Sequence, residues 1–270
     1  MSGKYFEKTE QQKINSFISL LNKSCSFLTL LRNTATVVLL QYIIFQACYA
    51  AITPDRTRII FDGSLRSVSI SVSNKNAHHP YLAQGWLEDD RGNKVKDYFT
   101  VLPPVQKIGP NRESQMRIQS LSSVSSLPAD RESVFWFNLR EIPPKSDEEN
   151  SLQIALQSRL KLFYRPAAIR VKEGDTPWQE KITLQKDGKN QTVVHNPTPY
   201  FVTIAEAGSH KGGSGIKGFE PVMIPPFSRR ALNISPEKLG NSPVLTYVND
   251  YGGRPELQFI CSGTICHVKK

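Results

Sequence analysis

Residues 151–166 read SLQIALQSRLKLFYRP. Leu152, Ile154 and Leu156 occupy every second position, a spacing that places all three side chains on one face of an extended strand. Basic residues, among them Lys161, follow this apolar ridge. A strand with these two features can add to the open edge of another protein's sheet, fill that protein's core with the ridge, and bind a carboxylate at its cationic end.

The pattern leaves a second interpretation open, because three aliphatic side chains on one strand face are also what the core of an ordinary β-sandwich requires. Strict alternation places Lys161 on the face opposite the ridge. Strong twist or a bulge between Leu156 and Lys161 would be needed to bring the cation and the ridge to the same side.

The first fifty residues have the composition of a secretory signal. Five basic residues precede the apolar run Val37–Phe45, and small residues follow as far as Ala50. The apolar run is short for a membrane span. We therefore predict that residues 1–50 are a signal peptide removed after Ala50, which implies export. An uncleaved anchor is the alternative, and the long basic region leaves the true start codon open.

Residues 51–270 suit two domains of about 110 residues each, and we place the boundary between 169 and 170. Without the signal, 29 basic and 22 acidic residues remain, so the net charge falls from +10 to +7. These charges are scattered, and no basic helix or aromatic RNA-binding motif accompanies them. The surface is therefore expected to favour acidic protein partners over nucleic acid.

No long amphipathic helix pattern occurs in residues 51–270. Short β-rich runs alternate with turn residues, and we expect about seven strands in the first half. Six of them can be given bounds: Thr57–Phe61, Ser67–Ser73, Tyr81–Glu88, Met116–Ile118, Val134–Leu139 and, as the longest strand, Leu152–Tyr164. A second series of strands is expected at Lys181–Gln185, Thr192–His195, Tyr200–Ala205, Val222–Ile224, Arg229–Ile234, Val244–Asn249, Glu256–Cys261 and Cys266–Lys269. This pattern predicts an all-β protein of two immunoglobulin-like sandwiches.

The cysteines support export. Cys25 and Cys48 lie in the predicted signal, which leaves Cys261 and Cys266 as an even pair around a Ser-Gly turn. A disulfide across a hairpin is the natural interpretation in an oxidising compartment. A metal site would need further Cys or His nearby, and no nucleophile–base pair or phosphate cradle is visible. We expect no cofactor, no metal and no enzymatic activity.

Several blocks of the sequence resemble the periplasmic pilus chaperones, the PapD-like family. The most extensive is LPADRESVFWFNLREIP at Leu127–Pro143, and four shorter blocks accompany it: Asp55–Arg58, Ser158–Pro166, Asn196–Tyr200 and Asn249–Gly253. Together these blocks extend the resemblance over essentially all of residues 51–270. The short connection Pro143–Asn150 resembles the branch of the family with a short F1–G1 loop.

The resemblance implies two immunoglobulin-like domains arranged as an L with a cleft between them. Such chaperones bind incomplete pilus subunits, lend them a strand, and deliver them to an outer-membrane usher. By resemblance, Leu152, Ile154 and Leu156 would fill the groove of the subunit, while Arg58 and Lys161 would anchor its terminal carboxylate.

The resemblance also implies a buried charge network of Glu132, Arg165 and Asp250 that joins the two domains. The free chain is expected to be able to self-associate through its donor-strand face. A structural pilus subunit or adhesin is the alternative function, but a subunit should be one incomplete domain with a donor extension, whereas both halves here have a full set of strands. A periplasmic hydrolase is disfavoured by the lack of a nucleophile–base pair.

Overall fold

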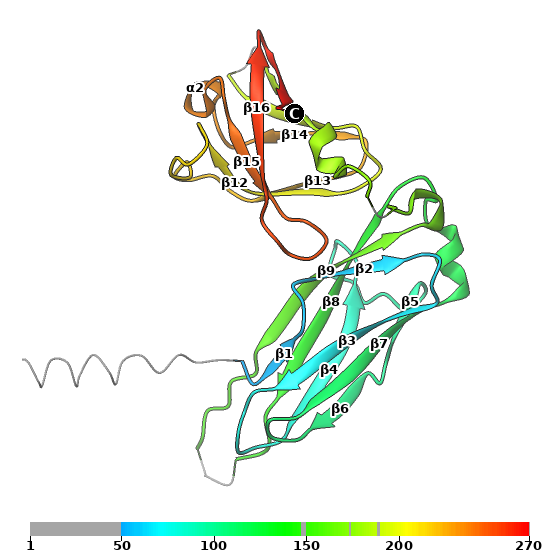
Figure 1. The fold of residues 1–270 in the computed structure, drawn as a ribbon. Helices are drawn as coiled ribbons and strands as arrows, with labels where there is room; N and C mark the ends of the chain where they lie inside the picture. The colour runs from blue at the N-terminus through cyan, green and yellow to red at the C-terminus, as the bar shows by residue number, and fades with distance from the viewer. Residues whose placement is uncertain (1–49, 147–149, 173, 188–189, 270) are drawn as a thin grey trace, which may run out of the picture. The chain divides into compact units, whose positions relative to one another are not determined.

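The computed structural model describes residues 50–146, 150–172, 174–187 and 190–269. Nearly all of the predicted signal peptide, residues 1–49, lies outside this part of the chain. Strands dominate the described residues and form two lobes (Figure 1). A search of the same residues for a helix long and apolar enough to cross a membrane found none. The predicted all-β class of two sandwich lobes is confirmed.

The first lobe is a sandwich of two sheets. One sheet has the order β1-β3-β7-β5, formed by Ile52–Pro54 (β1), Ser67–Asn74 (β3), Glu113–Ser120 (β7) and Phe99–Leu102 (β5). The other has the order β2-β9-β8-β4-β6, formed by Arg58–Asp62 (β2), Gln157–Arg165 (β9), Ser133–Ile142 (β8), Tyr81–Glu88 (β4) and Val105–Ile108 (β6).

Alternating side chains of the two sheets build the core of this lobe. In β3, Ile70 and Val72 are fully buried, while the serines between them are at least partly exposed. Phe61, Phe99 and Tyr164 pack against one another with ring centroids 5.2 to 5.9 Å apart. Each large side chain buried in this way contributes about 1.5–3 kcal/mol relative to an exposed one.

The second lobe has a single run of paired strands in the order β13-β12-β15-β16-β17-β10-β11-β14. Their bounds are Val222–Ile224 (β13), Val202–Gly208 (β12), Val244–Tyr247 (β15), Glu256–Ser262 (β16), Ile265–Val268 (β17), Thr183–Lys186 (β10), Thr192–Asn196 (β11) and Ser228–Leu232 (β14). Strand β16 pairs with β15 along its first half and with β17 along its second, so it links the two layers around a separate apolar core.

Helical structure is limited to short turns among the described residues. The four-residue helix α2 spans Pro236–Leu239, and three 3₁₀ turns lie at Ser122–Ser126, Ala167–Ile169 and Trp178–Lys181. The last two lie between the lobes in sequence.

The structure corrects one sequence-based prediction at the start of β9. The alternating pattern predicts a strand from Leu152 to Tyr164, but β9 begins at Gln157. Residues 151–156 pair with no strand among the described residues, and Leu152, Ile154 and Leu156 are 88%, 67% and 40% exposed. The ridge therefore does not belong to the core of this lobe. Because residues 151–156 do not form a strand, period-two alternation does not determine whether the ridge side chains lie on the same side as Lys161.

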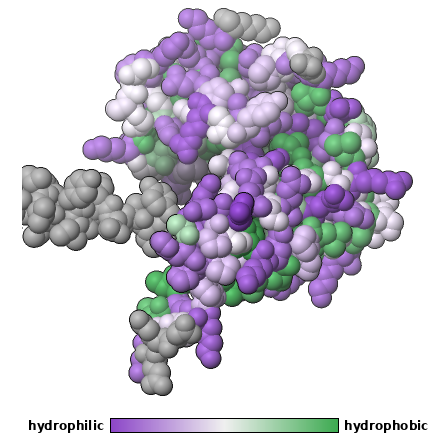
Figure 2. Space-filling model, turned by 60° about the horizontal axis from the view of Figure 1, so that its bottom comes forward, coloured by the Kyte–Doolittle hydropathy of each residue, from purple (hydrophilic) through white to green (hydrophobic). Residues whose placement is uncertain are grey.

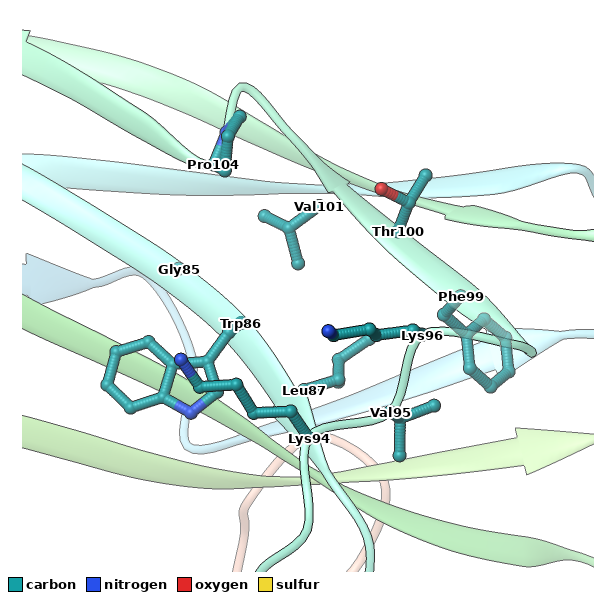
Figure 3. A pocket seen from close by; sticks show the side chains of 10 residues that line it. All are labelled: Gly85, Trp86, Leu87, Lys94, Val95, Lys96, Phe99, Thr100, Val101 and Pro104. Atoms are coloured by element: carbon teal, nitrogen blue, oxygen red, sulfur yellow. The ribbon is translucent and has the colours of Figure 1, made fainter.

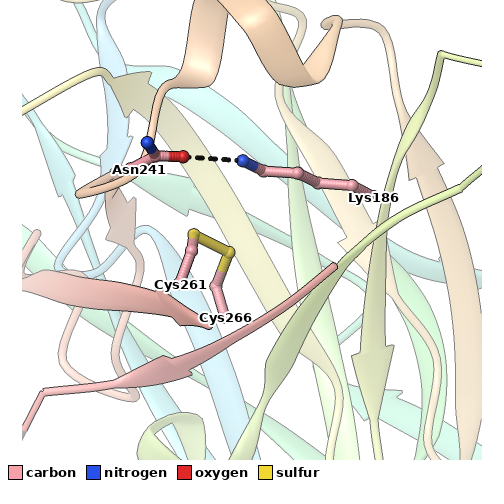
Figure 4. Close-up of a disulfide and its surroundings, with 4 residues drawn as sticks. All are labelled: Lys186, Asn241, Cys261 and Cys266. Carbon is pink, nitrogen blue, oxygen red and sulfur yellow. Dashed lines mark hydrogen bonds between the residues drawn. A yellow bond between two sulfur atoms is a disulfide. The ribbon is translucent and has the colours of Figure 1, made fainter. Parts of the chain in front are cut away.

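The predicted disulfide is present in the second lobe. Cys261 on β16 and Cys266 on β17 are directly opposed in the hairpin register and are bonded through their sulfur atoms. Figure 4 shows this hairpin beside the side chain of Lys186, whose Nζ donates a hydrogen bond to Asn241 Oδ1 at 2.9 Å.

Candidate donor edge and carboxylate site

Strand β9 has one edge that is only half covered. On one side it pairs antiparallel with β8 along Gln157–Tyr164. On the other side it pairs in parallel with β2, but only along Lys161–Arg165. Within the part of the chain that the structure describes, no strand pairs with the β2-facing edge of Gln157–Leu160. An uncovered edge of this kind presents backbone donors and acceptors to a further strand.

The exposed segment 151–156 leads directly into this open edge. It is tied to the end of β8 at Leu156, whose carbonyl oxygen accepts a hydrogen bond from the backbone nitrogen of Glu141 at 3.0 Å. The side chain of Gln153 donates to the carbonyl oxygen of Pro144 at 2.5 Å. Figure 2 shows green, apolar atoms at the surface of the narrow projection low in the view. The segment thus presents apolar side chains to solvent at the entrance of the edge.

Two cations stand where the open edge ends. Arg58 on β2 is directly opposite Lys161 on β9, and Lys161 is opposite Trp136 on β8, so the three share one face of the sheet. The Nζ atom of Lys161 lies 5.6 Å from the centre of the Trp136 ring. Arg58 donates through Nη1 to the carbonyl oxygen of Val248 at 3.2 Å, and its buried Nε has no partner among the described residues.

The electrostatics of this pair favour an anion. Burial lowers the pKa of Lys161, and the positive charge of Arg58 lowers it further. Burial also lowers the pKa of Arg58, although the carboxylate of Asp250 opposes that shift. Burial therefore disfavours the charged form of both side chains, and the charge of Arg58 adds to this effect for Lys161. A bound carboxylate would stabilise both charged forms.

The three residues of the expected charge network lie in contact. Arg165 donates to Glu132 through Nε at 2.9 Å, and it lies 2.9 and 3.1 Å from the two carboxylate oxygens of Asp250. Glu132 also accepts a hydrogen bond from the backbone nitrogen of Phe201 at 2.8 Å. Because Glu132 and Arg165 belong to the first lobe whereas Asp250 and Phe201 belong to the second, these contacts cross between lobes. The role of the network in orienting the lobes stays a prediction.

Glu132 and Asp250 both pair with the guanidinium of Arg165, and Glu132 is the more buried of the two carboxylates. Burial raises the pKa of Glu132 to about 7, against the opposing charge of Arg165. The guanidinium of Arg165 lies 4.9 Å from the Trp178 ring centre and 5.1 Å from that of Tyr200, whose rings are themselves 4.6 Å apart. This aromatic pair was not predicted from the sequence, since nothing in the spacing of Trp178 and Tyr200 marks a shared cation.

One cavity lies apart from these features. It has a volume of about 250 Å³ and is bordered by β4 and β5, with Leu87, Phe99 and Val101 in its apolar wall and Lys94 and Lys96 beside it (Figure 3). None of the predicted site residues lines it.

Comparison with known proteins shows the family of the chain. Residues 51–170 match the family model of the pili and flagellar-assembly chaperone PapD N-terminal domain, and residues 177–259 match that of the pili assembly chaperone PapD C-terminal domain. The chain is 49% identical over 219 residues to the probable fimbrial chaperone YfcS of Escherichia coli strain K12, covering 81% of this chain and 86% of that protein.

The chaperone protein PapD of Escherichia coli is 45% identical over 222 residues, covering 82% of this chain and 91% of PapD. A chain in the solved structure of the Salmonella enterica SafA pilin in complex with the SafB chaperone superposes with a TM-score of 0.64 at 25% identity. The match covers 80% of this chain and 98% of that one. With both family models matched in order and close relatives aligned over both lobes, the chain belongs to the PapD family of pilus-assembly chaperones.

Proposed function

We propose that this fimbrial chaperone binds pilus subunits in the periplasm, completes their fold by donor-strand complementation with residues 152–160, and delivers them to an outer-membrane usher. The observation that carries the proposal is the open edge of β9, preceded by three exposed aliphatic side chains. The names of the relatives, and the complex of a pilin with the SafB chaperone, support this class of partner.

An incomplete subunit lacks a strand and apolar side chains that this segment can supply. A sandwich that lacks a strand exposes an apolar trough and unpaired backbone groups, which invites aggregation. Leu152, Ile154 and Leu156 are free to enter such a trough because they have no place in the chaperone's own core. Burial of three aliphatic side chains contributes roughly 5–8 kcal/mol before the cost of ordering the segment.

Arg58 and Lys161 supply the anchor for the subunit's terminal carboxylate. Charge-assisted hydrogen bonds from both cations would hold the chain end at a fixed point of the edge. A fixed end also sets the register, and a slip of one residue would turn the wrong side chains toward the trough. The free protein is expected to cover the same exposed residues by self-association through this face.

The cellular compartment and the domain limits form part of the proposal. The predicted signal and the disulfide between Cys261 and Cys266 support a periplasmic protein. We assign residues 51–169 to the first domain and 170–270 to the second. The family is one of chaperones and not of enzymes. The alternative of a pilus subunit or adhesin is disfavoured because each lobe has its own apolar core.

The proposal is tested by recovering a tagged copy of the chain from the periplasm of a piliated strain and identifying the bound proteins by mass spectrometry. We expect pilus subunits with the wild-type chain and far fewer with the Leu152→Ser/Ile154→Ser double variant at equal chaperone level. Recovery of no pilus subunit with the wild type, or of equal amounts with both proteins, would refute the proposal.

A further inference from the structure

A buried carboxylate at the end of β8 has no role in the site described above. Glu141 follows the inward-facing residues Phe137 and Leu139 at the same alternating spacing, and it is only 5% exposed. Among the described residues no Lys, Arg or His forms an ion pair with it. A carboxylate in such a position is costly unless hydrogen-bond donors surround it, so its donors are informative.

Two backbone N–H groups from distant parts of the chain supply those donors. The nitrogen of Ile52 donates to Oε2 at 3.0 Å, and the nitrogen of Leu156 donates to Oε1 at 3.3 Å. Ile52 is the first residue of β1, in the opposite sheet, and Leu156 is the last residue before β9. The backbone of Glu141 also donates to Leu156, so Leu156 is held at both its N–H and its C=O.

The geometry points to Glu141 as a positioning residue that fixes where the segment 151–156 leaves the sheet, and so how the apolar ridge is presented to a subunit. One carboxylate joins β1, β8 and the start of β9, which makes the path of the segment depend on the first strand of the lobe. The effect of Glu141 on subunit binding rests on the proposed function.

The chemistry explains why a carboxylate occupies this position. Each of its two oxygens accepts one N–H, whereas the amide of glutamine has a single acceptor oxygen and an NH₂ group that cannot accept. Glu141→Gln should therefore satisfy one backbone N–H and leave the other without a partner, and Glu141→Ala should leave both. The two variants differ in a way that a general loss of stability would not reproduce.

The first test is site-resolved amide hydrogen exchange by NMR on the free protein. In Glu141→Ala we expect the amides of Ile52 and Leu156 to exchange about ten- to a hundredfold faster, as for a lost hydrogen bond to a charged acceptor. In Glu141→Gln one of the two should do so. The amide of Ile118, in the middle of the opposite sheet, serves as the internal reference and should be unchanged. Glu113→Gln, at an exposed position on β7, is the matched control.

The second test measures capture of pilus subunits in the periplasm with the same variants. We expect several-fold less subunit with Glu141→Ala than with Glu113→Gln at equal chaperone level. Unchanged exchange at Leu156 in Glu141→Ala would overturn the inference, and so would undiminished capture despite faster exchange. If Glu141→Ala does not fold, Glu141→Gln carries both tests, and unchanged exchange at both Ile52 and Leu156 in that variant would overturn the inference. Failure of the wild type to capture any subunit would count against the proposed function, while the exchange experiment would still decide whether Glu141 holds the segment.

Discussion

At the scale of single residues, Arg58 and Lys161 are two half-buried cations on neighbouring strands. Substitution of either by alanine should leave a folded protein that no longer retains subunits, because burial disfavours the charged form of both side chains and the fold therefore gains little from them. A bound carboxylate would lose a partner while desolvated, a loss of about 2–5 kcal/mol. That corresponds to roughly thirtyfold to several thousandfold in affinity.

The measurement is the amount of subunit that co-purifies from the periplasm, with circular dichroism as the check of folding. Arg117→Ala, at an exposed position of the opposite sheet, is the control and should behave as wild type. Normal subunit recovery with Arg58 and Lys161 both replaced would show that these cations do not anchor the chain end.

Glu132 predicts a dependence of stability on pH. Its pKa in the folded chain, about 7, is above the ordinary value of 4.5, so the folded state binds a proton more tightly than the unfolded state. This favourable difference is complete below pH 4.5 and is lost as pH rises through 7. The free energy of unfolding should therefore fall by up to about 3 kcal/mol from this group across that window.

Urea unfolding at several values between pH 5 and pH 8 measures this effect. Glu132→Gln cannot titrate there and keeps an oxygen to accept the N–H of Phe201. It should show a clearly flatter dependence than the wild type. An equal slope in the two proteins would mean that Glu132 is ionised throughout the window.

At the scale of elements, the segment 151–156 is an unpaired chain that carries exposed aliphatic side chains. Ile154→Asp should abolish subunit capture more completely than Gln153→Asp, because an unpartnered carboxylate buried in the subunit's trough costs several kcal/mol. Both variants should fold, since residues 153 and 154 are both exposed. Co-purification measures capture, and loss of the β-sheet signal in free Ile154→Asp would contradict the assignment of the ridge to a binding surface.

The hairpin of β16 and β17 predicts a modest role for its disulfide. Cys261 and Cys266 are separated by five positions, and closure of so short a loop stabilises a protein by only about 2 kcal/mol in the chain-entropy model. The Cys261→Ser/Cys266→Ser variant should fold with a free energy of unfolding lower by about that amount, as measured by urea titration. A variant that fails to fold at all would show that the bond does more than close this loop.

The elements differ in how well the sequence predicts them, for physical reasons. Ser67–Ser73 was predicted nearly to its ends because one buried face gives a clear period of two. Strands β1, β5 and β6, of three or four residues, are too short to show a period and were missed. The apolar alternation at Leu152–Leu156 predicts a strand because such alternation is typical of strands in a sheet. Among the described residues, however, no strand pairs with this segment, and β9 begins only at Gln157.

The residues of the candidate site also differ in how well the sequence predicts them. Arg58 and Lys161 were predicted through a family resemblance, whereas Glu141 was missed because its partner Ile52 is 89 residues away and no local pattern marks the contact. Trp136 was likewise missed, since only the pairing of β8 with β9 places it beside Lys161. Sequence patterns report on faces of single strands, and contacts between strands depend on register.

At the scale of the whole molecule, Arg165 connects two lobes that have separate cores. Arg165→Leu should lower the free energy of unfolding by about 3–5 kcal/mol, because it leaves the Glu132 carboxylate buried without its cation. It should also separate the unfolding of the lobes into two transitions in calorimetry, since the contact of Arg165 with Asp250 is lost.

Arg131→Leu is the matched control for this change. Arg131 pairs with Asp130 at 2.8 Å, and its guanidinium lies 5.2 Å from the ring centre of Phe227 in the second lobe. Because this pair is exposed to solvent and screened, the loss of Arg131 should destabilise the protein far less than the loss of Arg165. Similar destabilisation by the two substitutions would show that the burial of Arg165 has no special weight in joining the lobes.

The parallel register of β2 and β9 has a consequence for the direction of any chain that binds beside them. A strand that continues the line of β2 along Gln157–Leu160 can run either way, and one of its ends must meet Arg58 and Lys161. If the bound chain terminates there and runs parallel to β9, its terminal group is a carboxylate, which the cations attract. If it terminates there and runs antiparallel, its terminal group is an ammonium group, which they repel. As the proposed carboxylate anchor, the two cations should therefore favour a parallel free carboxyl terminus over an antiparallel chain or an internal loop, before any side chain is recognised.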